Sequence, residues 1–475
     1  MAKKPTKITV RSYQVGFGDC FLLMVHYRGD KKKHILIDFG TTAKPKTMDN
    51  PDKKDLLLSV AENIRDTCGG KLDAVVVTHR HKDHLSGFGT QGKKNDEGKT
   101  RGDIIRDCDP DLVILPWTEE PRLATDAKEP FKGLTSEEFQ KQPEKGFVSS
   151  LLGMQEVARS IKLESELLSD GKFIEPLAAK TAGQLSFIGQ NNIANRSAVE
   201  NLIKMTEGGK GRYVHAEYDL QKDFDKKFPG VKVDVMGPPT ITQYSKVKKQ
   251  RSSDKNEFWL EQALNKNYWA LQAETSKSIS QETKSKDIVR EGPFPDAPSF
   301  DGENIPPYTR WFIRRMRGLR GRQLLNIVRI LDKAMNNTSV ILLFEIGDQK
   351  LLFSGDAQIE NWEYCLKDEA MMKKLEDTSL YKVGHHGSRN ATPKSLWKRF
   401  KNKDLAKDDP MRLKTVISTM HGKHGHTEET AVPRKTLVEA LEENSEHTST
   451  EGITSMEIPY VDVEINLEIG ASHGN

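Results

Sequence analysis

The chain has 475 residues, 36% of them hydrophobic and 30% charged, and its formal net charge at pH 7 is +4. This length allows up to about three average domains, and the composition excludes an intrinsically disordered chain. The small net charge excludes binding to nucleic acid through overall charge, so any basic surface must be local. The four scattered cysteines form no C-x-x-C pair, which excludes a disulfide framework or a thiolate metal cage and fits a reducing compartment.

The sequence gives no sign of export or membrane insertion. No apolar segment follows the charged N-terminus, as it would in a signal peptide. The longest apolar runs, such as Phe21–Val25 and Val340–Phe344, are far too short to cross a bilayer. We therefore expect a soluble, cytoplasmic protein that does not bind a membrane.

Strand-like and helix-like segments alternate towards both ends of the chain. A helix is predicted where Leu56, Leu57, Val60 and Ile64 recur at helical spacing. Short apolar runs bounded by turn residues predict strands. In chain order these predicted strands are Ile8–Val15, Cys20–His26, His34–Asp38, Leu72–Val77, Leu112–Leu115, Val231–Met236, Val340–Glu345, Lys350–Phe353, Tyr381–Val383 and Thr415–Ser418.

Two long segments interrupt this pattern. Charged, helix-favouring stretches such as Glu137–Gln142 and Leu151–Leu168 dominate the first segment, and the second is strongly polar and basic. The pattern therefore predicts one layered α/β core with two insertions. The core is expected to comprise residues 1–117, 231–239 and 336–475, with a helical insertion at 118–230 and a basic insertion at 240–335.

The most informative motif follows the predicted strand Leu72–Val77 and reads Thr-His-Arg-His-Lys-Asp-His. It places His79, His81, Asp83 and His84 within six residues. The alternation of side chains at a strand end lets the first two histidines point the same way. Imidazole and carboxylate groups held this close are ligands that zinc and similar divalent metals favour. The motif therefore predicts a metal site rather than a solvated loop.

Other strand ends carry side chains of the same kind. Asp356 follows an apolar strand and a glycine, where its carboxylate could bridge two cations. His385 and His386 lie between glycines at the next strand end, and a histidine-rich stretch ending at His426 follows a later one. Asp38 ends an upstream strand, where it could anchor a metal-ligating histidine by a hydrogen bond. Each signal is weak alone, because turn aspartates and loop histidines are common.

Together these motifs resemble the metallo-β-lactamase fold superfamily, and within it the ComEC-type hydrolases, which include the hydrolase domain of bacterial DNA-uptake channels. The resemblance covers the core and not the insertions. The resemblance implies an α/β fold, namely a metallo-β-lactamase αββα sandwich with two largely helical insertions. The matching segments, in the order of that group, are Val15–Cys20, Asp38–Gly40, Gly237–Pro239, Asn336–Leu342, Gly355–Asp356, Val383–Ser388 and Gly425–His426.

The resemblance also implies a site for two divalent metal ions, either zinc or manganese. His79 and His81 would bind the first ion, and Asp83 and His84 would bind the second. Asp356 would bridge the two. Many ComEC-type members have aspartate where His81 stands, so this chain resembles more closely the zinc-competent pattern.

For the remaining candidate residues the resemblance leaves more than one role open. Either His385 or His386 would complete the shell of the second ion, and the other would be free for proton transfer. The superfamily usually supplies a further histidine to the first ion, but this chain has none between His215 and His385. Asn337 lies at about that place and would substitute through its amide oxygen, or else the first site would be weaker. Our working assignment takes His385 as a metal ligand, Asp38 as the anchor behind a ligand, and Asp83, His386 and His426 as the catalytic groups.

Arginines and aromatic residues gather in the basic insertion, where six arginines fall within thirteen residues around Trp311 and Phe312. Guanidinium groups match phosphate geometry, and aromatic faces stack on bases. Ile313, Met316 and Leu319 equally predict one apolar stripe on a helix that faces solvent or a partner. The candidates for phosphate or nucleic-acid binding are Arg310, Arg314, Arg315, Arg317, Arg320 and Arg322.

These features predict a metal-dependent hydrolase, most specifically a phosphodiesterase or nuclease that cleaves DNA. A hydroxide bridging the two ions would attack phosphorus, and a histidine would protonate the leaving oxygen. One alternative is a hydrolase of a small phosphodiester or another ester, because the metal chemistry alone does not name a substrate. Another is an effector subunit of a multi-protein assembly, such as a bacterial defence system, with protein partners bound through the insertions.

Overall fold

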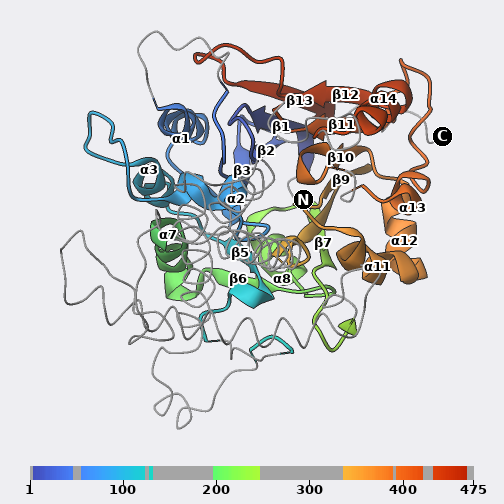
Figure 1. Ribbon diagram of the computed structural model, residues 1–475, viewed down its shortest axis with the longest axis horizontal. Helices are drawn as coiled ribbons and strands as arrows, with labels where there is room; N and C mark the ends of the chain where they lie inside the picture. Colours follow the sequence, from blue (N-terminus) through green and yellow to red (C-terminus); the bar gives the residue numbers. More distant parts are fainter. Residues whose placement is uncertain are drawn as a thin grey trace, which may run out of the picture. The chain divides into compact units, whose positions relative to one another are not determined.

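The computed structural model describes residues 4–45, 55–122, 128–131, 196–245, 335–388, 392–420 and 432–467. All of these residues belong to one compact unit of the chain. They form a mixed α/β structure with two sheets and flanking helices (Figure 1). None of the described helices is both long enough and apolar enough to span a membrane.

The first sheet contains seven strands within the described ranges, in the order β13-β1-β2-β3-β4-β5-β6. Strands from β13 to β3 pair antiparallel, and strands from β3 to β6 pair parallel. Within the parallel half, β4 and β5 read as continuous, fully buried apolar runs, as is typical of strands covered on both faces. The strands are β1 (Pro5–Tyr13), β2 (Cys20–Tyr27), β3 (Lys32–Phe39), β4 (Ala74–Val76), β5 (Val113–Pro116), β6 (Gly211–Val214) and β13 (Tyr460–Asn466).

The second sheet contains six strands in the same part of the chain, in the order β12-β11-β10-β9-β8-β7. Strands from β12 to β9 pair parallel, and β8 pairs antiparallel with both of its neighbours. The parallel strands in each sheet therefore end together at one edge, where loops can bring polar side chains into contact. The strands are β7 (Val231–Gly237), β8 (Ile341–Ile346), β9 (Gln349–Phe353), β10 (Leu380–Lys382), β11 (Lys414–Ile417) and β12 (Glu446–Ser449).

The two sheets pack against each other around one apolar core. Ile37 and Val76 of the first sheet and Leu342 of the second are among its fully or almost fully buried side chains. Phe21 and Phe353 meet across it edge to face, with ring centroids 6.1 Å apart. This core fixes the two sheets relative to each other and so fixes the strand ends on which polar residues lie.

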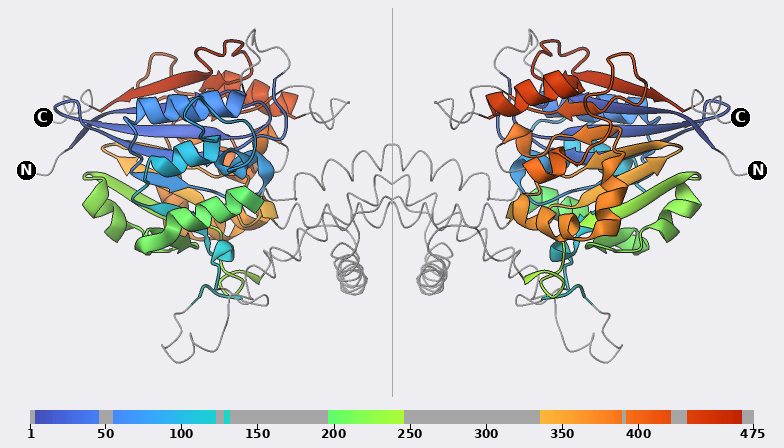
Figure 2. Two further views of the ribbon diagram at one scale, coloured as in Figure 1. Left: turned by 90° about the vertical axis from the view of Figure 1, so that its left-hand side faces the viewer. Right: turned by 90° about the vertical axis from the view of Figure 1, so that its right-hand side faces the viewer.

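Helices cover the outer faces of the two sheets (Figures 1 and 2). α1 buries Leu57, Val60 and Ile64 at helical spacing, and the Asp55 side chain caps its first turn by accepting the Leu58 N–H. A second apolar cluster joins the second sheet to its helices through Trp362, which is fully buried. The helices are α1 (Leu56–Thr67), α2 (Lys82–Leu85), α3 (Arg101–Asp107), α7 (Arg196–Thr206), α8 (Gln221–Lys227), α11 (Ile359–Lys367), α12 (Glu369–Glu376), α13 (Lys394–Trp397) and α14 (Lys435–Asn444).

The expectation of an α/β core is confirmed, and every predicted strand has a counterpart in the structure. Three strands had no predicted counterpart, namely β6, β12 and β13. β6 falls within residues 118–230 and pairs with β5 of the first sheet. The segments Glu137–Gln142 and Leu151–Leu168 lie outside the described residues, and the boundaries of the two insertions stay predictions.

His34 on β3 should make the protein less stable in mild acid. Burial lowers its pKa from 6.5 to about 4, although Asp73 opposes this shift. Between these values the unfolded chain binds a proton that the folded chain does not, so the free energy of unfolding falls as pH falls, by up to about 3 kcal/mol. Urea unfolding of the metal-free protein measures the free energy of unfolding at about pH 7.5 and about pH 5. Its decrease between these pH values should be about 2 kcal/mol smaller in His34→Leu than in the wild type. Parallel pH dependences in the two proteins would contradict this.

Candidate metal centre

Polar side chains from several strand ends meet in one buried region between the two sheets. Asp38 lies near the end of β3, and His79 follows β4 by two residues of loop. Asp356 follows β9, and His386 follows β10 in the second sheet. All four side chains are almost fully buried. Buried polar groups of this kind require partners, so their mutual contacts define what the region can do.

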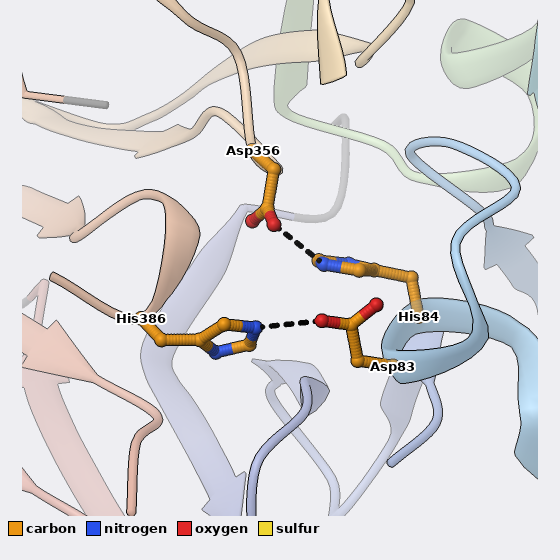
Figure 3. Close-up of side chains that lie close together, drawn as sticks. All are labelled: Asp83, His84, Asp356 and His386. Carbon is orange, nitrogen blue, oxygen red and sulfur yellow. Dashed lines mark hydrogen bonds and ion pairs between the residues drawn. The ribbon is translucent and has the colours of Figure 1, made fainter. Parts of the chain in front are cut away.

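Two of these side chains, together with two from α2, could hold a metal ion. Asp83 and His84 lie on α2, and one ligand atom from each of Asp83, His84, Asp356 and His386 lies within 4.8 Å of the others. Figure 3 shows the two facing pairs, with Asp83 Oδ2 3.0 Å from His386 Nε2 and His84 Nε2 3.1 Å from Asp356 Oδ2. Two carboxylates and two imidazoles form a donor set that suits zinc or manganese. We call these four residues the Asp/His cluster.

Hydrogen bonds behind the two histidines direct their ligand atoms into the cluster. His84 Nδ1 lies 2.8 Å from Asp38 Oδ2, and the same carboxylate accepts the Thr78 N–H at 2.7 Å. His386 Nδ1 lies 3.0 Å from the Ser418 carbonyl oxygen. Each contact occupies Nδ1 and leaves Nε2 facing the cluster, as in carboxylate- or carbonyl-supported metal histidines. The structure thus places Asp38 where the sequence predicted an anchor.

The charges in the cluster balance one another. Burial alone would raise the pKa of Asp83, but His386 and His84 lower it well below its usual range. Burial alone would lower the pKa of His386, but Asp19 and Asp83 raise it to about 10. In the metal-free protein these shifts favour protonated imidazoles paired with ionised carboxylates. A divalent cation would supply the same positive charge by replacing these protons.

His79 and His81 form a second possible set of ligands beside the cluster. His79 Nε2 lies 2.9 Å from His81 Nδ1, and the His79 ring centroid lies 4.2 Å from that of His84. Burial, with the nearby His84 and His81, lowers the pKa of His79 well below its usual value. A neutral imidazole is the form that binds a metal. All four ligand candidates of the His-x-His-x-Asp-His motif therefore lie in one buried region.

The adjacent histidines His385 and His386 occupy different positions. His386 is fully buried and belongs to the cluster, whereas 27% of the His385 side chain is exposed. His385 Nε2 is 3.9 Å from Asp356 Oδ2, and its Nδ1 contacts Ser388 Oγ at 2.7 Å. Both residues have positive φ angles, 45° and 52°, which are uncommon outside glycine and are often found at functional sites. The geometry thus separates a buried histidine from one at the edge of the site.

Asn336 and Asn337 have buried side-chain amides that find no hydrogen-bond partner among the described residues. Their turn is tied to the site from both sides. The Val340 N–H donates to the Thr78 carbonyl at 2.9 Å, and the Asp356 N–H donates to Ser339 Oγ at 3.2 Å. An unsatisfied buried amide is costly and calls for an explanation. A role of the Asn337 side-chain oxygen as a metal ligand would explain its lack of a hydrogen-bond partner among the described residues.

Sequence reasoning missed Asp19 and Lys382, which lie directly behind the cluster. Their side chains form a buried ion pair. Asp19 belongs to the Val15–Cys20 segment but carried no predicted role. The signal at Lys382 is a lysine inside an apolar strand, where only a buried partner can compensate its charge.

Several predicted site residues cannot be placed. His426 and the arginines between Arg310 and Arg322 lie outside the described residues. The catalytic role of His426 and the nucleic-acid role of the arginines therefore stay predictions. Searches against protein-family models and against curated proteins found no match.

Proposed function

We propose that this chain is a metal-dependent hydrolase with the metallo-β-lactamase fold, acting on phosphodiesters and most specifically on DNA. The observation that carries the proposal is the buried Asp/His cluster at adjoining strand ends. The packing of two sheets with helices on their outer faces is consistent with this fold. The ordered motifs of the sequence, from Val15–Cys20 to Gly425–His426, favour the ComEC-type group within it.

The proposed hydrolase would use two neighbouring divalent ions. Asp83, His84, Asp356 and His386 would hold one ion, and His79 and His81 would hold the other. When bound, such ions lower the pKa of water and neutralise the negative charge that develops during phosphodiester cleavage. The cluster residues lie too deep to contact much of a large substrate, so their role is to bind and orient.

The positions of the adjacent histidines suggest how their roles divide. His386 is buried, and its Nδ1 contacts a carbonyl oxygen, which suits a metal ligand. His385 is only partly buried, and its Nδ1 contacts Ser388 Oγ, so it is better placed to exchange a proton with a leaving oxygen. We therefore propose the reverse of the working assignment made from the sequence, with His386 as ligand and His385 as proton donor.

The substrate class rests on the arginine-rich sequence between Arg310 and Arg322 together with the metal chemistry. The test uses the purified full chain with Mn²⁺ or Zn²⁺ on plasmid DNA, single-stranded DNA, RNA and a small generic phosphodiester. Cleavage of DNA that is lost in His79→Ala supports the proposal. Cleavage of only the small phosphodiester would narrow it to a non-nuclease phosphodiesterase. Intact substrates throughout, with no difference between wild type and His79→Ala, would refute it.

Asn337 should be a ligand of the ion held by His79 and His81. The side chain has an amide oxygen without a partner in the described structure, so removing it breaks no hydrogen bond there. Asn337→Ala is expected to reduce the bound metal from about two ions per chain to about one, measured by mass spectrometry after dialysis. Asn336→Ala removes a neighbouring amide of equal burial and serves as the matched control. Full occupancy in Asn337→Ala would exclude this ligand.

A further inference from the structure

Two buried charged residues, Asp19 and Lys382, have no part in the chemistry proposed above. Asp19 is fully buried, Lys382 is 2% exposed, and their side chains form an ion pair. Asp19 directly precedes β2 of the first sheet, whereas Lys382 ends β10 of the second. The pair therefore joins the two sheets. A buried ion pair contributes little net stability, because the cost of desolvating both charges offsets their mutual attraction. Stability alone therefore does not account for this pair.

Asp19 contacts three of the four residues in the Asp/His cluster. Its backbone N–H donates to the Asp83 carbonyl oxygen at 2.9 Å. Its Oδ1 lies 3.4 Å from His386 Nδ1, and its Oδ2 lies 3.8 Å from His84 Nδ1. These atoms face the sides of both histidines that are turned away from the cluster. The Asp38 carboxylate and the Ser418 carbonyl oxygen lie closer to these Nδ1 atoms, at 2.8 and 3.0 Å, so Asp19 adds a negative charge behind both rings rather than their hydrogen bonds.

Lys382 contacts the remaining member of the cluster and the loop that carries it. Its Nζ donates to the Gly355 carbonyl oxygen at 3.1 Å and lies 3.8 Å from Asp356 Oδ1. The same ammonium group is paired with Asp19. Lys382 therefore links the carboxylate that supports the histidines to the carboxylate that belongs to the cluster. Neither Asp19 nor Lys382 can reach a substrate in solvent, because both are buried.

We propose that Asp19 and Lys382 act as a positioning pair that sets the affinity and the coordination geometry of the Asp/His cluster for a divalent metal. Asp19 places its charge behind His386 and His84, whose hydrogen bonds come from Ser418 and Asp38, and Lys382 fixes Asp19 and Asp356 in their places. This inference rests on the proposed metal-binding function and adds to it two residues that do not touch the metal. Partners of this kind commonly change metal affinity by roughly 10- to 100-fold when they are replaced.

The test measures Co²⁺ binding to the full chain after its own metals have been removed with a chelator. The visible absorption of Co²⁺ reports its coordination geometry, and a competing chelator gives its affinity. Asp19→Asn and Lys382→Met are each expected to weaken Co²⁺ binding by roughly 10-fold or more and to shift the absorption bands. A role in folding alone would lower the melting temperature but would leave the spectrum of bound Co²⁺ unchanged.

Asp73→Asn provides a matched control. Asp73 is also a buried aspartate paired with a lysine, Lys33, but it precedes β4, whereas the metal-binding motif follows that strand. This variant should lose stability and keep the wild-type Co²⁺ affinity and spectrum. If Asp19→Asn does not fold, the double variant Asp19→Asn/Lys382→Met, which removes both charges together, takes its place with the same expected weakening.

The outcomes separate this inference from the proposed function. Wild-type affinity and spectrum in the Asp19 and Lys382 variants would overturn the positioning pair and leave the metal site standing. An effect of equal size in Asp73→Asn would also overturn it, because the effect would then be one of general stability. A wild-type chain that binds no Co²⁺ would refute both the metal-binding function and the pair.

Discussion

Replacing Asp356 with asparagine is expected to slow metal-dependent phosphodiester cleavage by roughly 1,000-fold, equivalent to about 4 kcal/mol of transition-state stabilisation. Asp356 Oδ2 lies 3.1 Å from His84 Nε2, and Oδ1 accepts the His385 N–H at 3.0 Å. The carboxamide keeps the size of the side chain and one oxygen acceptor. It removes one negative charge from the proposed metal site. Initial rates with Mn²⁺, together with metal content by mass spectrometry, measure the effect.

The control for this prediction is Asp234→Asn. Asp234 lies on β7 of the same sheet, is paired with Lys374 and is outside the Asp/His cluster. It should cleave at close to the wild-type rate and bind the same amount of metal. A wild-type rate in Asp356→Asn, with full metal content, would show that this carboxylate takes no part in the reaction.

The strands were predictable where burial imposes an apolar run. Leu72–Val77 and Leu112–Leu115 correspond to β4 and β5, which are buried on both faces of the first sheet. β12 (Glu446–Ser449) could not be found in this way, because none of its four residues is a large apolar side chain. It joins the sheet at the edge by backbone hydrogen bonds to β11, and such bonds do not require an apolar side-chain pattern.

The ligand candidates were predictable because metal chemistry restricts residue types at strand ends. His79 to His84 and Asp356 were selected on this ground, and the structure brings them together although they are far apart in the sequence. Asp19 and Lys382 were missed because Asp19 alone resembles an ordinary turn residue, and the lysine at the end of an apolar strand does not reveal its partner. Only the fold pairs them, and a single sequence gives no means of pairing residues so distant.

The choice between His385 and His386 could not be made from the sequence, because the two residues are neighbours of the same type. The left-handed backbone of both residues turns one ring into the core and leaves the other at the edge. This difference predicts opposite effects for two substitutions. His386→Ala should weaken metal binding by more than about 100-fold, because it removes a ligand and not only its support.

His385→Ala should instead leave metal affinity nearly unchanged and slow cleavage by roughly 100-fold, the usual contribution of a general acid. The reason is that the His385 side chain contacts the cluster only at its edge, with Nε2 3.9 Å from Asp356 Oδ2. Mn²⁺ affinity and the single-turnover cleavage rate, measured for both variants, separate binding from proton transfer. The reverse pattern, with metal lost in His385→Ala and retained in His386→Ala, would restore His385 as the ligand. Each variant thus serves as the control for the other, because they differ only in which of two adjacent imidazoles is removed.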